Sequence, residues 1–297
     1  MKPLEHIVHD LCRPMSPLPT DTAARLDHLP AVKAVLFDVY GTLFISGSGD
    51  VGTAAATDTA EAMTQALEAA HYKGDLKKAG ELGKDRLKAE VLEWHTASRA
   101  AGIEFPEVDI ARIWKKVIVR LRKDGVLKPP RLDIEPIRKL ALEYECLVNP
   151  VWPMPDCLET LHTLKERGLV IGIVSNAQFY TPLLFSAFFE QTLADLGFDT
   201  DCCIWSYKEL KAKPSADLFP RAEKYLKRNH GIKLSETVYV GNDMLNDIYC
   251  ASRAGCKTVL FAGDRRSLRL RESDERCMDI NPDAIITSLD QLSDLIQ

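Results

Sequence analysis

The sequence lacks any segment that would place the protein in or across a membrane. No apolar run approaches the roughly 18–20 residues that a membrane-spanning helix needs. The first residues, MKPLEHIVHDLCRP, carry acids and histidines where a secretory signal needs an apolar stretch. Positive charge is not in excess either, because the 297 residues have a net charge of −5, which argues against a general nucleic-acid binder. We therefore expect a cytoplasmic protein with neither a membrane nor a nucleic-acid partner.

Paired cysteine motifs are absent as well. The chain has eight cysteines, but none lies in a C-x-x-C pair, so neither a zinc site nor a disulfide framework is indicated in a chain of this length. We expect reduced and mostly buried thiols. Apolar residues make up 46% and charged residues 27% of the sequence, which is typical of a globular protein large enough for two domains.

The composition changes along the chain. Residues 1–30 contain several prolines and no long periodic segment, so we predict an N-terminal extension that packs on the surface or stays loose. Residues 46–53, SGSGDVGT, have the composition of a flexible hinge. From about 54 to 148, apolar residues recur at helical spacing, which predicts about four helices and a helical domain over 47–150.

The remaining residues, 31–46 and 151–297, alternate between short apolar runs and helical segments. The expected strands lie at residues 32–37, 169–175, 202–206, 237–241, 257–263 and in a final stretch, AIITS. Continuous apolar strands separated by helices predict an α/β core domain with a doubly wound parallel sheet that is covered on both faces. The all-α domain would be inserted after the first strand.

Polar side chains gather at the expected carboxyl ends of these strands, where parallel sheets bind their ligands. They are Asp38, Ser175, Asn176, Lys213, Asn242, Asp243, Asn246 and Asp247. Several carboxylates beside a lysine suit a nucleophilic carboxylate that works next to a divalent metal, which offsets repulsion from an anionic substrate. Magnesium suits such oxygen ligands better than zinc does. The lysine and the hydroxyl groups would hold phosphoryl oxygens.

Four segments, FDVYGTL, VSNA, KAKPSADLF and VGNDMLNDIYCASRAG, resemble in sequence and order the motifs of the haloacid dehalogenase superfamily. The resemblance covers about 31–46 and 151–287, and the helical domain takes the position of the family's inserted cap. It implies a Rossmann-like core with an all-α cap domain and an active site in the cleft between them. It also implies that Asp38 is a nucleophile that forms a covalent intermediate, and that Lys213 holds Asp38 and the substrate charge in place.

The same resemblance implies roles for the other motif residues. Ser175, with Asn176 nearby, would bind the transferring group, and Thr42 would help to shape the first loop. The expected Mg²⁺ ligands are Asp38, the backbone carbonyl of Tyr40, and the acidic loop with Asn242, Asp243 and Asp247. The substrate would be a small and probably anionic molecule; neither its identity nor the oligomeric state follows from the sequence.

Tyr40 departs from the usual phosphatase pattern, which has a second aspartate two residues after the nucleophile. A neutral phenol with a pKa near 10 is a poor base at pH 7 and a weaker acid than a carboxylic acid. The segment DVYGT instead resembles the dehalogenase branch, in which the aspartate attacks carbon, a halide leaves, and no metal is needed. The acid pair Asp243 and Asp247 resembles magnesium-dependent members, whereas anchoring the motif on Gly241 places Asn242 at the ligand position.

Three functions therefore remain open. A magnesium-dependent phosphatase acting on a small phosphorylated metabolite is favoured, because two acids at a strand end repel each other unless a cation is present. A carbon-centred hydrolase of the dehalogenase type is the first alternative. A non-catalytic binding protein that kept the fold is the second, since a fold does not fix a function.

Two further groups of residues could face the substrate. Trp94, His95 and Arg99 lie on an expected cap helix, where surface exposure or helix packing is the favoured explanation. The arginine-rich segment 265–271 follows an expected strand end and could bind an anionic substrate or a partner, although a solvated loop explains it as well.

Overall fold

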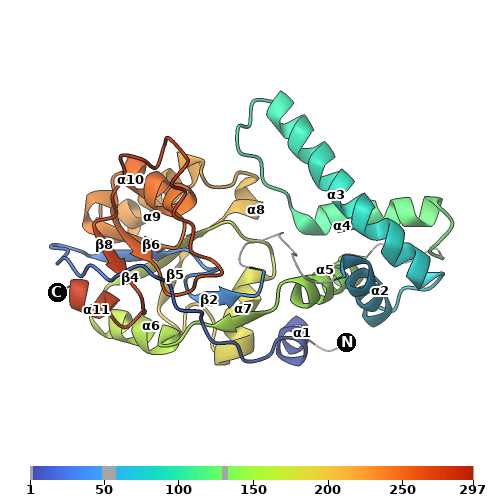
Figure 1. The fold of residues 1–297 in the computed structure, drawn as a ribbon, viewed down its shortest axis with the longest axis horizontal. Coiled ribbons are helices and arrows are strands. Elements are labelled where there is room, and N and C mark those ends of the chain that lie inside the picture. Colours follow the sequence, from blue (N-terminus) through green and yellow to red (C-terminus); the bar gives the residue numbers. More distant parts are fainter. Residues whose placement is uncertain (1–2, 49–57, 129–132, 297) are drawn as a thin grey trace.

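The computed structural model describes residues 3–48, 58–128 and 133–296, which form an α/β part and a helical part (Figure 1). The α/β part is built on six strands: β1 (Ala34–Phe37), β4 (Val170–Ser175), β5 (Phe198–Trp205), β6 (Thr237–Gly241), β7 (Lys257–Phe261) and β8 (Ala284–Ile286). They pair in the order β5–β4–β1–β6–β7–β8, and every neighbouring pair is parallel. The predicted doubly wound parallel sheet is confirmed, although β5 begins earlier than the apolar run CCIWS.

Helices cover both faces of the sheet. One face packs against α6 (Cys157–Glu166), α7 (Thr181–Phe189) and α11 (Leu292–Leu295), and the other against α9 (Phe219–Tyr225), η2 (Leu226–His230) and α10 (Cys250–Ala254). In β1, Val35 and Phe37 join the first core and Ala34 and Leu36 join the second, and none of the four is exposed. This two-sided burial is why the strand reads as a continuous apolar run. Short helical turns complete this part: α8 (Ser206–Glu209), η1 (Ala216–Leu218), η3 (Leu234–Glu236) and η4 (Met244–Tyr249).

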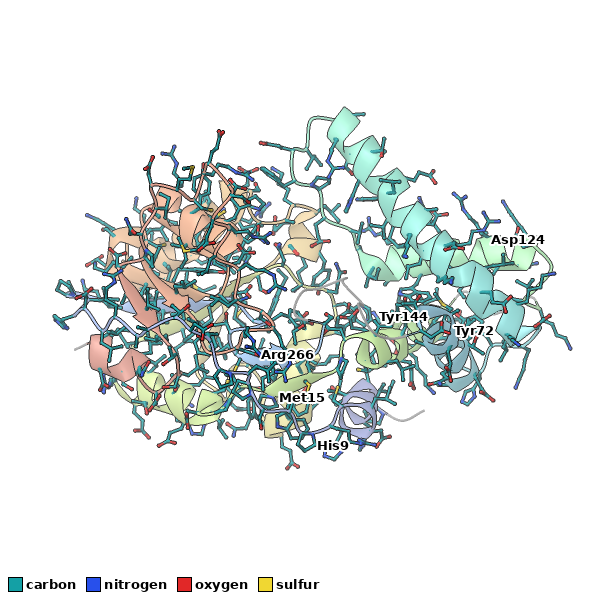
Figure 2. The ribbon with its side chains drawn as sticks, viewed as in Figure 1. His9, Met15, Tyr72, Asp124, Tyr144 and Arg266 are labelled. Atoms are coloured by element: carbon teal, nitrogen blue, oxygen red, sulfur yellow. The ribbon has the colours of Figure 1, made fainter. Side chains whose placement is uncertain are left out.

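In the residues that the structure describes, the helical part contains four helices: α2 (Thr59–Ala69), α3 (Leu76–Ala100), α4 (Ile110–Lys123) and α5 (Ile134–Val148). An aspartate precedes each of them, and the side chains of Asp58, Asp75 and Asp109 accept hydrogen bonds from backbone N–H groups of the first turn. The helices enclose their own apolar core, in which Trp114 is almost fully buried. Figure 2 shows Tyr72 and Tyr144 in this part of the molecule, away from Arg266 in the α/β part.

A pair of short antiparallel strands connects the two parts. β2 (Phe44–Ser46) leaves the α/β part and β3 (Val151–Pro153) returns to it, with Phe44 opposite Pro153. The sequence did not predict these strands, because three-residue segments are too short to show a periodic pattern. Of the predicted hinge over 46–53, residues 49–53 lie outside the described residues.

The N-terminal segment is more ordered than its proline content suggested. Leu4–Leu11 forms helix α1, whose Ile7 and Val8 are buried in the core of the α/β part and which contacts α5 and α7. Further along, the backbone N–H of Leu29 donates to the carbonyl of Leu295 (2.8 Å). The segment therefore packs on the surface of the fold through apolar contacts, which was one of the two predicted outcomes, but its helix was not predicted.

Two expectations from composition can be compared with the structure. No helix in the described ranges has the length and apolar character needed to cross a membrane. All eight cysteines are buried, in agreement with the expected burial of most of these thiols, and none forms a disulfide bond.

We expect Val8→Ala to lower the free energy of unfolding by about 2 kcal/mol, because Val8 is fully buried and its truncation leaves a void between α1 and the core. Urea denaturation would measure the change. The matched control is His9→Ala on the exposed side of the same helix. Equal stability of the two variants would show that α1 is not part of the folded core.

Candidate active site

The first strand delivers Asp38 to the carboxyl edge of the sheet. Asp38 follows β1 directly, and its backbone N–H donates to the carbonyl of Val240 in β6 (2.9 Å). The chain then turns sharply at Gly41, which has a φ of +83°. A Cβ atom there would lie 2.5 Å from the Cβ of Ser267, so both the backbone angle and the close approach require glycine.

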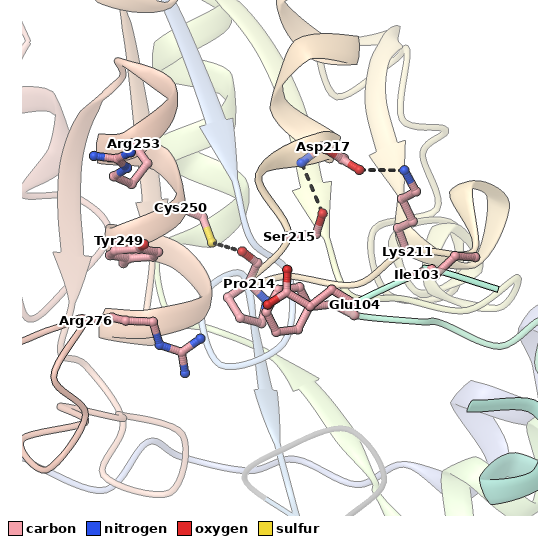
Figure 3. A pocket seen from close by; sticks show the side chains of 12 residues that line it. Ile103, Glu104, Lys211, Pro214, Ser215, Asp217, Tyr249, Cys250, Arg253 and Arg276 are labelled. Atoms are coloured by element: carbon pink, nitrogen blue, oxygen red, sulfur yellow. Dashed lines mark hydrogen bonds and ion pairs between the residues drawn. The ribbon is translucent and has the colours of Figure 1, made fainter. Parts of the chain in front are cut away.

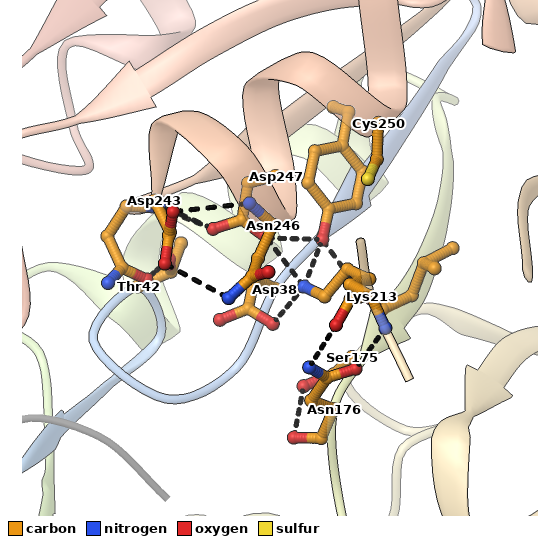
Figure 4. Close-up of polar contacts among 12 residues, drawn as sticks. Asp38, Thr42, Ser175, Asn176, Lys213, Asp243, Asn246, Asp247 and Cys250 are labelled. Carbon is orange, nitrogen blue, oxygen red and sulfur yellow. Dashed lines mark hydrogen bonds and ion pairs between the residues drawn. The ribbon is translucent and has the colours of Figure 1, made fainter. Parts of the chain in front are cut away.

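The side chain of Lys213 binds three groups from three segments (Figure 4). Its Nζ lies 2.7 Å from Oδ1 of Asp38, 2.5 Å from Oδ1 of Asp247 and 2.9 Å from the hydroxyl of Tyr239. An ammonium group has three N–H donors, so each one finds an acceptor. Only 2% of the lysine side chain is exposed, and a buried charge with fewer partners would cost several kcal/mol.

These contacts fix the charge of the lysine. Burial lowers the pKa of Lys213, but the adjacent carboxylates of Asp247 and Asp38 outweigh it and raise the pKa above its ordinary value. The ammonium is therefore fully protonated near pH 7, and it balances one of the two carboxylates that it contacts.

Asp247 orients the lysine and shapes the loop after β6. Its Oδ1 binds Lys213, and its Oδ2 accepts the backbone N–H groups of Asn242 and Asp243, each at 2.9 Å. A Cβ atom on Gly241 would lie 2.4 Å from Cγ of Asp247, so only glycine admits this carboxylate. Burial raises the pKa of Asp247 to about 7, against the opposing effect of Lys213. Both of its oxygens are thus occupied by groups of the protein.

The carboxylate of Asp243 has three partner residues in the described part of the chain. Its Oδ1 accepts the backbone N–H of Leu245 (2.8 Å), which caps the start of η4. Its Oδ2 pairs with the guanidinium of Arg271 (2.6 Å) and also accepts from the side chain of Asn246 (3.0 Å). An arginine of the protein therefore neutralises this acid, which the sequence had left to a metal ion.

The arginine-rich segment returns to the site rather than pointing into solvent. Arg271 pairs with Asp243, and the backbone N–H of Arg269 donates to the carbonyl of Asn242 (3.0 Å). Arg266 pairs with the buried Asp264 (3.0 Å). Anion binding was one of the two predictions for segment 265–271, and Arg271 binds an acid of the protein itself. That pairing with Asp243 was not predicted.

Asn176 ties the second strand end to the lysine. The backbone N–H of Lys213 donates to Oδ1 of Asn176 (2.7 Å), and Nδ2 of Asn176 donates to the carbonyl of Lys213 (3.2 Å). Ser175 precedes it, is fully buried, and donates its hydroxyl to the carbonyl of Asn176 (3.2 Å). The side-chain amide of Asn176 therefore acts as a clamp on the backbone of the catalytic candidate Lys213.

Tyr40 and Thr42 complete the first loop. The Tyr40 hydroxyl lies 3.0 Å from Oγ1 of Thr181, and burial raises the pKa of Tyr40 well above its usual range. Its phenol is thus neutral and internally paired. Thr42 donates its hydroxyl to Oδ1 of Asn242 (3.0 Å), and Nδ2 of Asn242 donates to the carbonyl of Ser267 (2.6 Å).

The predicted residues line one small pocket of about 50 Å³. Its walls are Asp38, Tyr40, Asn176, Lys213, Asn242, Asp243, Asn246, Asp247, Ser267 and Arg269. Thr42 and Ser175 stand behind these walls, each hydrogen-bonded to one of them. Of the three candidates on the cap helix, His95 lines a separate cavity of about 630 Å³, Trp94 donates to the carbonyl of Glu107, and Arg99 is exposed.

The donor atoms at this pocket fit a hard cation in part. Both oxygens of Asp243 already bind Leu245, Asn246 or Arg271, but Oδ2 of Asp38 accepts no hydrogen bond from the residues that the structure describes. Tyr40, with its backbone carbonyl, and Asn242, with its amide oxygen, line the same pocket. These are all oxygen donors, which suit magnesium. No three His, Cys, Asp or Glu side chains in the described ranges form a ready-made metal cluster. The oxygens of Asp247 are already in use.

Comparison with known proteins identifies the family. The family model described as "haloacid dehalogenase-like hydrolase" matches residues 32–255, which is most of the chain. The chain belongs to the haloacid dehalogenase-like hydrolases. The suspected superfamily and the expectation of an enzyme are both confirmed.

Relatives within this hydrolase family carry different activities. The chain is 29% identical over 143 residues to a ribulose-1,5-bisphosphate 5-phosphatase from Halopiger xanaduensis, covering 48% of this chain and 56% of the relative. It is 29% identical over 154 residues to a phosphoglycolate phosphatase from Haemophilus influenzae, covering 50% and 59%. The chain thus matches little more than half the length of these curated relatives.

A solved structure supports the fold. A 2-haloacid dehalogenase from Pseudomonas syringae pv. tomato has a TM-score of 0.55 and 18% identity, covering 89% of this chain and 97% of that one. At this identity the likeness shows the shared fold, and the chemistry must be argued from the residues of this hydrolase.

We expect Lys213→Met to destabilise the protein by about 3–5 kcal/mol, because it leaves Asp38 and Asp247 buried together without their cation. Adding Asp247→Asn to this variant should restore part of the loss, since one uncompensated charge is then removed. Thermal and urea unfolding of Lys213→Met, Asp247→Asn and the double variant would measure this coupling. Strictly additive losses would contradict the ion-pair interpretation.

Proposed function

We propose that this hydrolase is a magnesium-dependent phosphatase for small phosphorylated metabolites and that it acts through an aspartyl intermediate on Asp38. The observation that carries the proposal is the state of the Asp38 carboxylate. One oxygen is held by Lys213 at 2.7 Å, while the other lines the pocket without a hydrogen bond from the described residues. A nucleophile needs this combination of a fixed orientation and one free oxygen. The two phosphatase relatives support phosphorus as the atom attacked.

In the proposed reaction, an oxygen of Asp38 attacks the phosphorus and forms an acyl phosphate while the bond to the leaving oxygen breaks. Water then cleaves the acyl phosphate, which releases phosphate and restores the carboxylate. Lys213 holds Asp38 in one orientation throughout, and Asn176 holds the backbone of Lys213. Arg269, which lines the same pocket, would add positive charge next to the phosphoryl oxygens.

Magnesium would be held by Asp38, the carbonyl of Tyr40 and Asn242, all of which line the pocket, and Asp243 would join them only if the metal replaced Arg271 as its partner. When bound, it would supply the positive charge that offsets repulsion between the carboxylate and an anionic substrate. We assign Asp247 a different role from the direct ligand that the motif suggested, because both of its oxygens already bind Lys213 and the loop backbone.

We also propose limits for the domains. Residues 31–46 and 151–297 would form the catalytic core domain, 47–150 the cap domain, and 1–30 an extension of the core. The separate apolar core of the helices supports an independent cap. Closure of a cap over the site would exclude water and select the substrate.

A haloacid-type reaction is the second candidate, and Tyr40 is the observation that favours it. Burial raises the pKa of Tyr40, and its neutral phenol is paired with Thr181. The phenol is therefore too weak an acid to protonate a poor leaving group. A halide leaves without protonation, and attack on carbon would use the same Asp38 and Lys213.

We expect Asp38→Asn to reduce phosphate release from p-nitrophenyl phosphate by at least about 1,000-fold while leaving the folded state intact, because an amide oxygen is a poor nucleophile. Steady-state rates and circular dichroism would measure the two properties. The matched control is Asp21→Asn, an exposed aspartate outside the pocket, which should keep the parent rate. A parent rate in Asp38→Asn would remove Asp38 from the reaction.

We expect EDTA to abolish phosphate release and added Mg²⁺ to restore it, because the charge of Lys213 is shared with Asp247 and the anionic substrate would otherwise meet Asp38 without a divalent cation between them. Rates against a panel of small phosphate esters, with and without Mg²⁺, would test this. Halide release from 2-haloacids in the presence of EDTA, with no hydrolysis of phosphate esters, would instead establish the second candidate.

A further inference from the structure

The connection between α3 and α4 contacts the α/β part next to Lys213. The backbone N–H of Glu107 donates to the carbonyl of Leu210 (3.1 Å), and that of Ala212 donates to the carbonyl of Phe105 (2.9 Å). A helical-domain segment thus runs antiparallel to the residues that immediately precede the lysine. Figure 3 shows the neighbouring Glu104 beside Pro214, and both line one pocket. This is a second attachment of the helical part, separate from the β2–β3 pair.

The carboxylate of Glu107 crosses from the helical part to the α/β part. Its Oε2 accepts the hydroxyl of Ser206 (2.8 Å), and its Oε1 accepts the backbone N–H of Val108 (2.8 Å) and Nε2 of Gln178 (3.3 Å). Burial raises the pKa of Glu107, and these three donors oppose the shift. A carboxylate withdrawn from water is tolerated because donors from two parts of the fold satisfy it.

Gln178 and Ser206 are the core side of this contact, and both are buried. Oε1 of Gln178 accepts the backbone N–H of Ile110, the first residue of α4 (2.9 Å), and its Nε2 also donates to the carbonyl of Val108 (3.0 Å). Oγ of Ser206 accepts the backbone N–H of Ala177 (2.9 Å). One glutamate therefore touches the residues that follow β4 and β5.

A short path leads from this contact to the site. Ser206 accepts a hydrogen bond from the backbone N–H of Ala177, which is the next residue in the chain after Asn176. The side-chain amide of Asn176 in turn forms two hydrogen bonds with the backbone of Lys213. The backbone pairing around Glu107 reaches the same lysine from the other side, through Leu210 and Ala212. Both loops that carry the clamp and the lysine are thus anchored to one segment of the helical part.

We propose that Glu107 is a positioning residue that couples the helical domain to the placement of Asn176 and Lys213. The proposal rests on the proposed function only in treating these two residues as parts of the active site. Glu107 would act through Ser206 and Gln178, and it would hold the loops in the register that points Nζ of Lys213 at Asp38. Loss of its charge would loosen both loops without removing any group that touches the substrate.

The variant Glu107→Gln tests the carboxylate itself. Its shape is retained, but an amide has only one acceptor oxygen. If that oxygen faces Ser206, the NH₂ group faces the donors of Val108 and Gln178, and that side of the contact is lost. In the other orientation Oγ of Ser206 must accept from the NH₂ group and turn its own proton to the carbonyl of Ala177 (3.3 Å), so a charge-assisted bond is replaced by a neutral one. The matched control is Glu104→Gln, an exposed glutamate in the same connection.

Two measurements are needed. Steady-state hydrolysis of p-nitrophenyl phosphate with Mg²⁺ should show kcat falling about 10–100-fold in Glu107→Gln, with KM changed less than about threefold, because misplacement of reacting groups lowers the rate more than binding. Amide hydrogen exchange should be at least about tenfold faster in residues 176–178 and 210–213 than in the parent. Glu104→Gln should match the parent in both measurements.

A third variant distinguishes coupling from general destabilisation. Ser206→Ala should reproduce much of the kcat loss, and the double variant with Glu107→Gln should lose little more than Glu107→Gln alone, since both act on one path. Additive losses, or exchange that rises throughout the chain instead of in these two loops, would overturn the proposal. So would parent-like kcat and parent-like exchange in Glu107→Gln.

The exchange measurement separates this inference from the proposed function. If the parent protein hydrolysed no phosphate ester, the proposed function would fail, whereas faster exchange confined to 176–178 and 210–213 would still support the coupling. If the parent were an active phosphatase and Glu107→Gln exchanged as slowly as Glu104→Gln, the coupling alone would be wrong.

Discussion

The buried ammonium of Lys213 is the constraint on which the site depends. It can remain charged away from water only if Asp38, Asp247 and Tyr239 all present their oxygens to it, and these residues come from three separate segments. Each segment must therefore reach the same point to within hydrogen-bonding distance. This requirement explains why the surrounding loops are held by so many backbone contacts and why Gly241 faces Asp247 without a side chain.

Internal cations change the electrostatic argument for a metal. The sequence suggested that acids gathered at a strand end need a hard cation, but Lys213 pairs with both Asp38 and Asp247, and Arg271 pairs with Asp243. These two cations offset two of the three negative charges, so repulsion between the acids is a weaker argument for magnesium than the sequence suggested. The stronger argument is the second oxygen of Asp38, which faces a pocket of oxygen donors and would meet an anionic substrate there. A cation at this place would mainly lower the repulsion between Asp38 and the substrate, and it would contribute little to the stability of the fold.

The sequence predicted the sheet and the main site residues because strand ends of a parallel sheet converge whatever the details of the loops. Asp38, Asn176 and Lys213 follow from that rule and from the motif order. Arg271 and Glu107 could not be assigned in this way, since their partners Asp243 and Ser206 lie 28 and 99 residues away along the chain. The only local signal was the cluster of arginines at 265–271. Helix α1 was missed although Leu4, Ile7, Val8 and Leu11 recur at helical spacing, because it has only eight residues and lies in a segment that was judged by its prolines.

The burial of Tyr40 means that the first loop supplies no side chain able to protonate a leaving group. Its hydroxyl is paired with Thr181, and burial raises its pKa, so transfer of the phenolic proton to a leaving group would leave a buried phenolate close to Asp38. Such an anion is costly in a site that already holds three carboxylates. The backbone carbonyl carries no such cost, and it lies beside Asp38 by chain connection. A phosphatase built on this loop would therefore favour esters whose leaving oxygen needs little protonation, or whose own groups supply the proton. This restriction comes from the first loop and is independent of the shape of the cap.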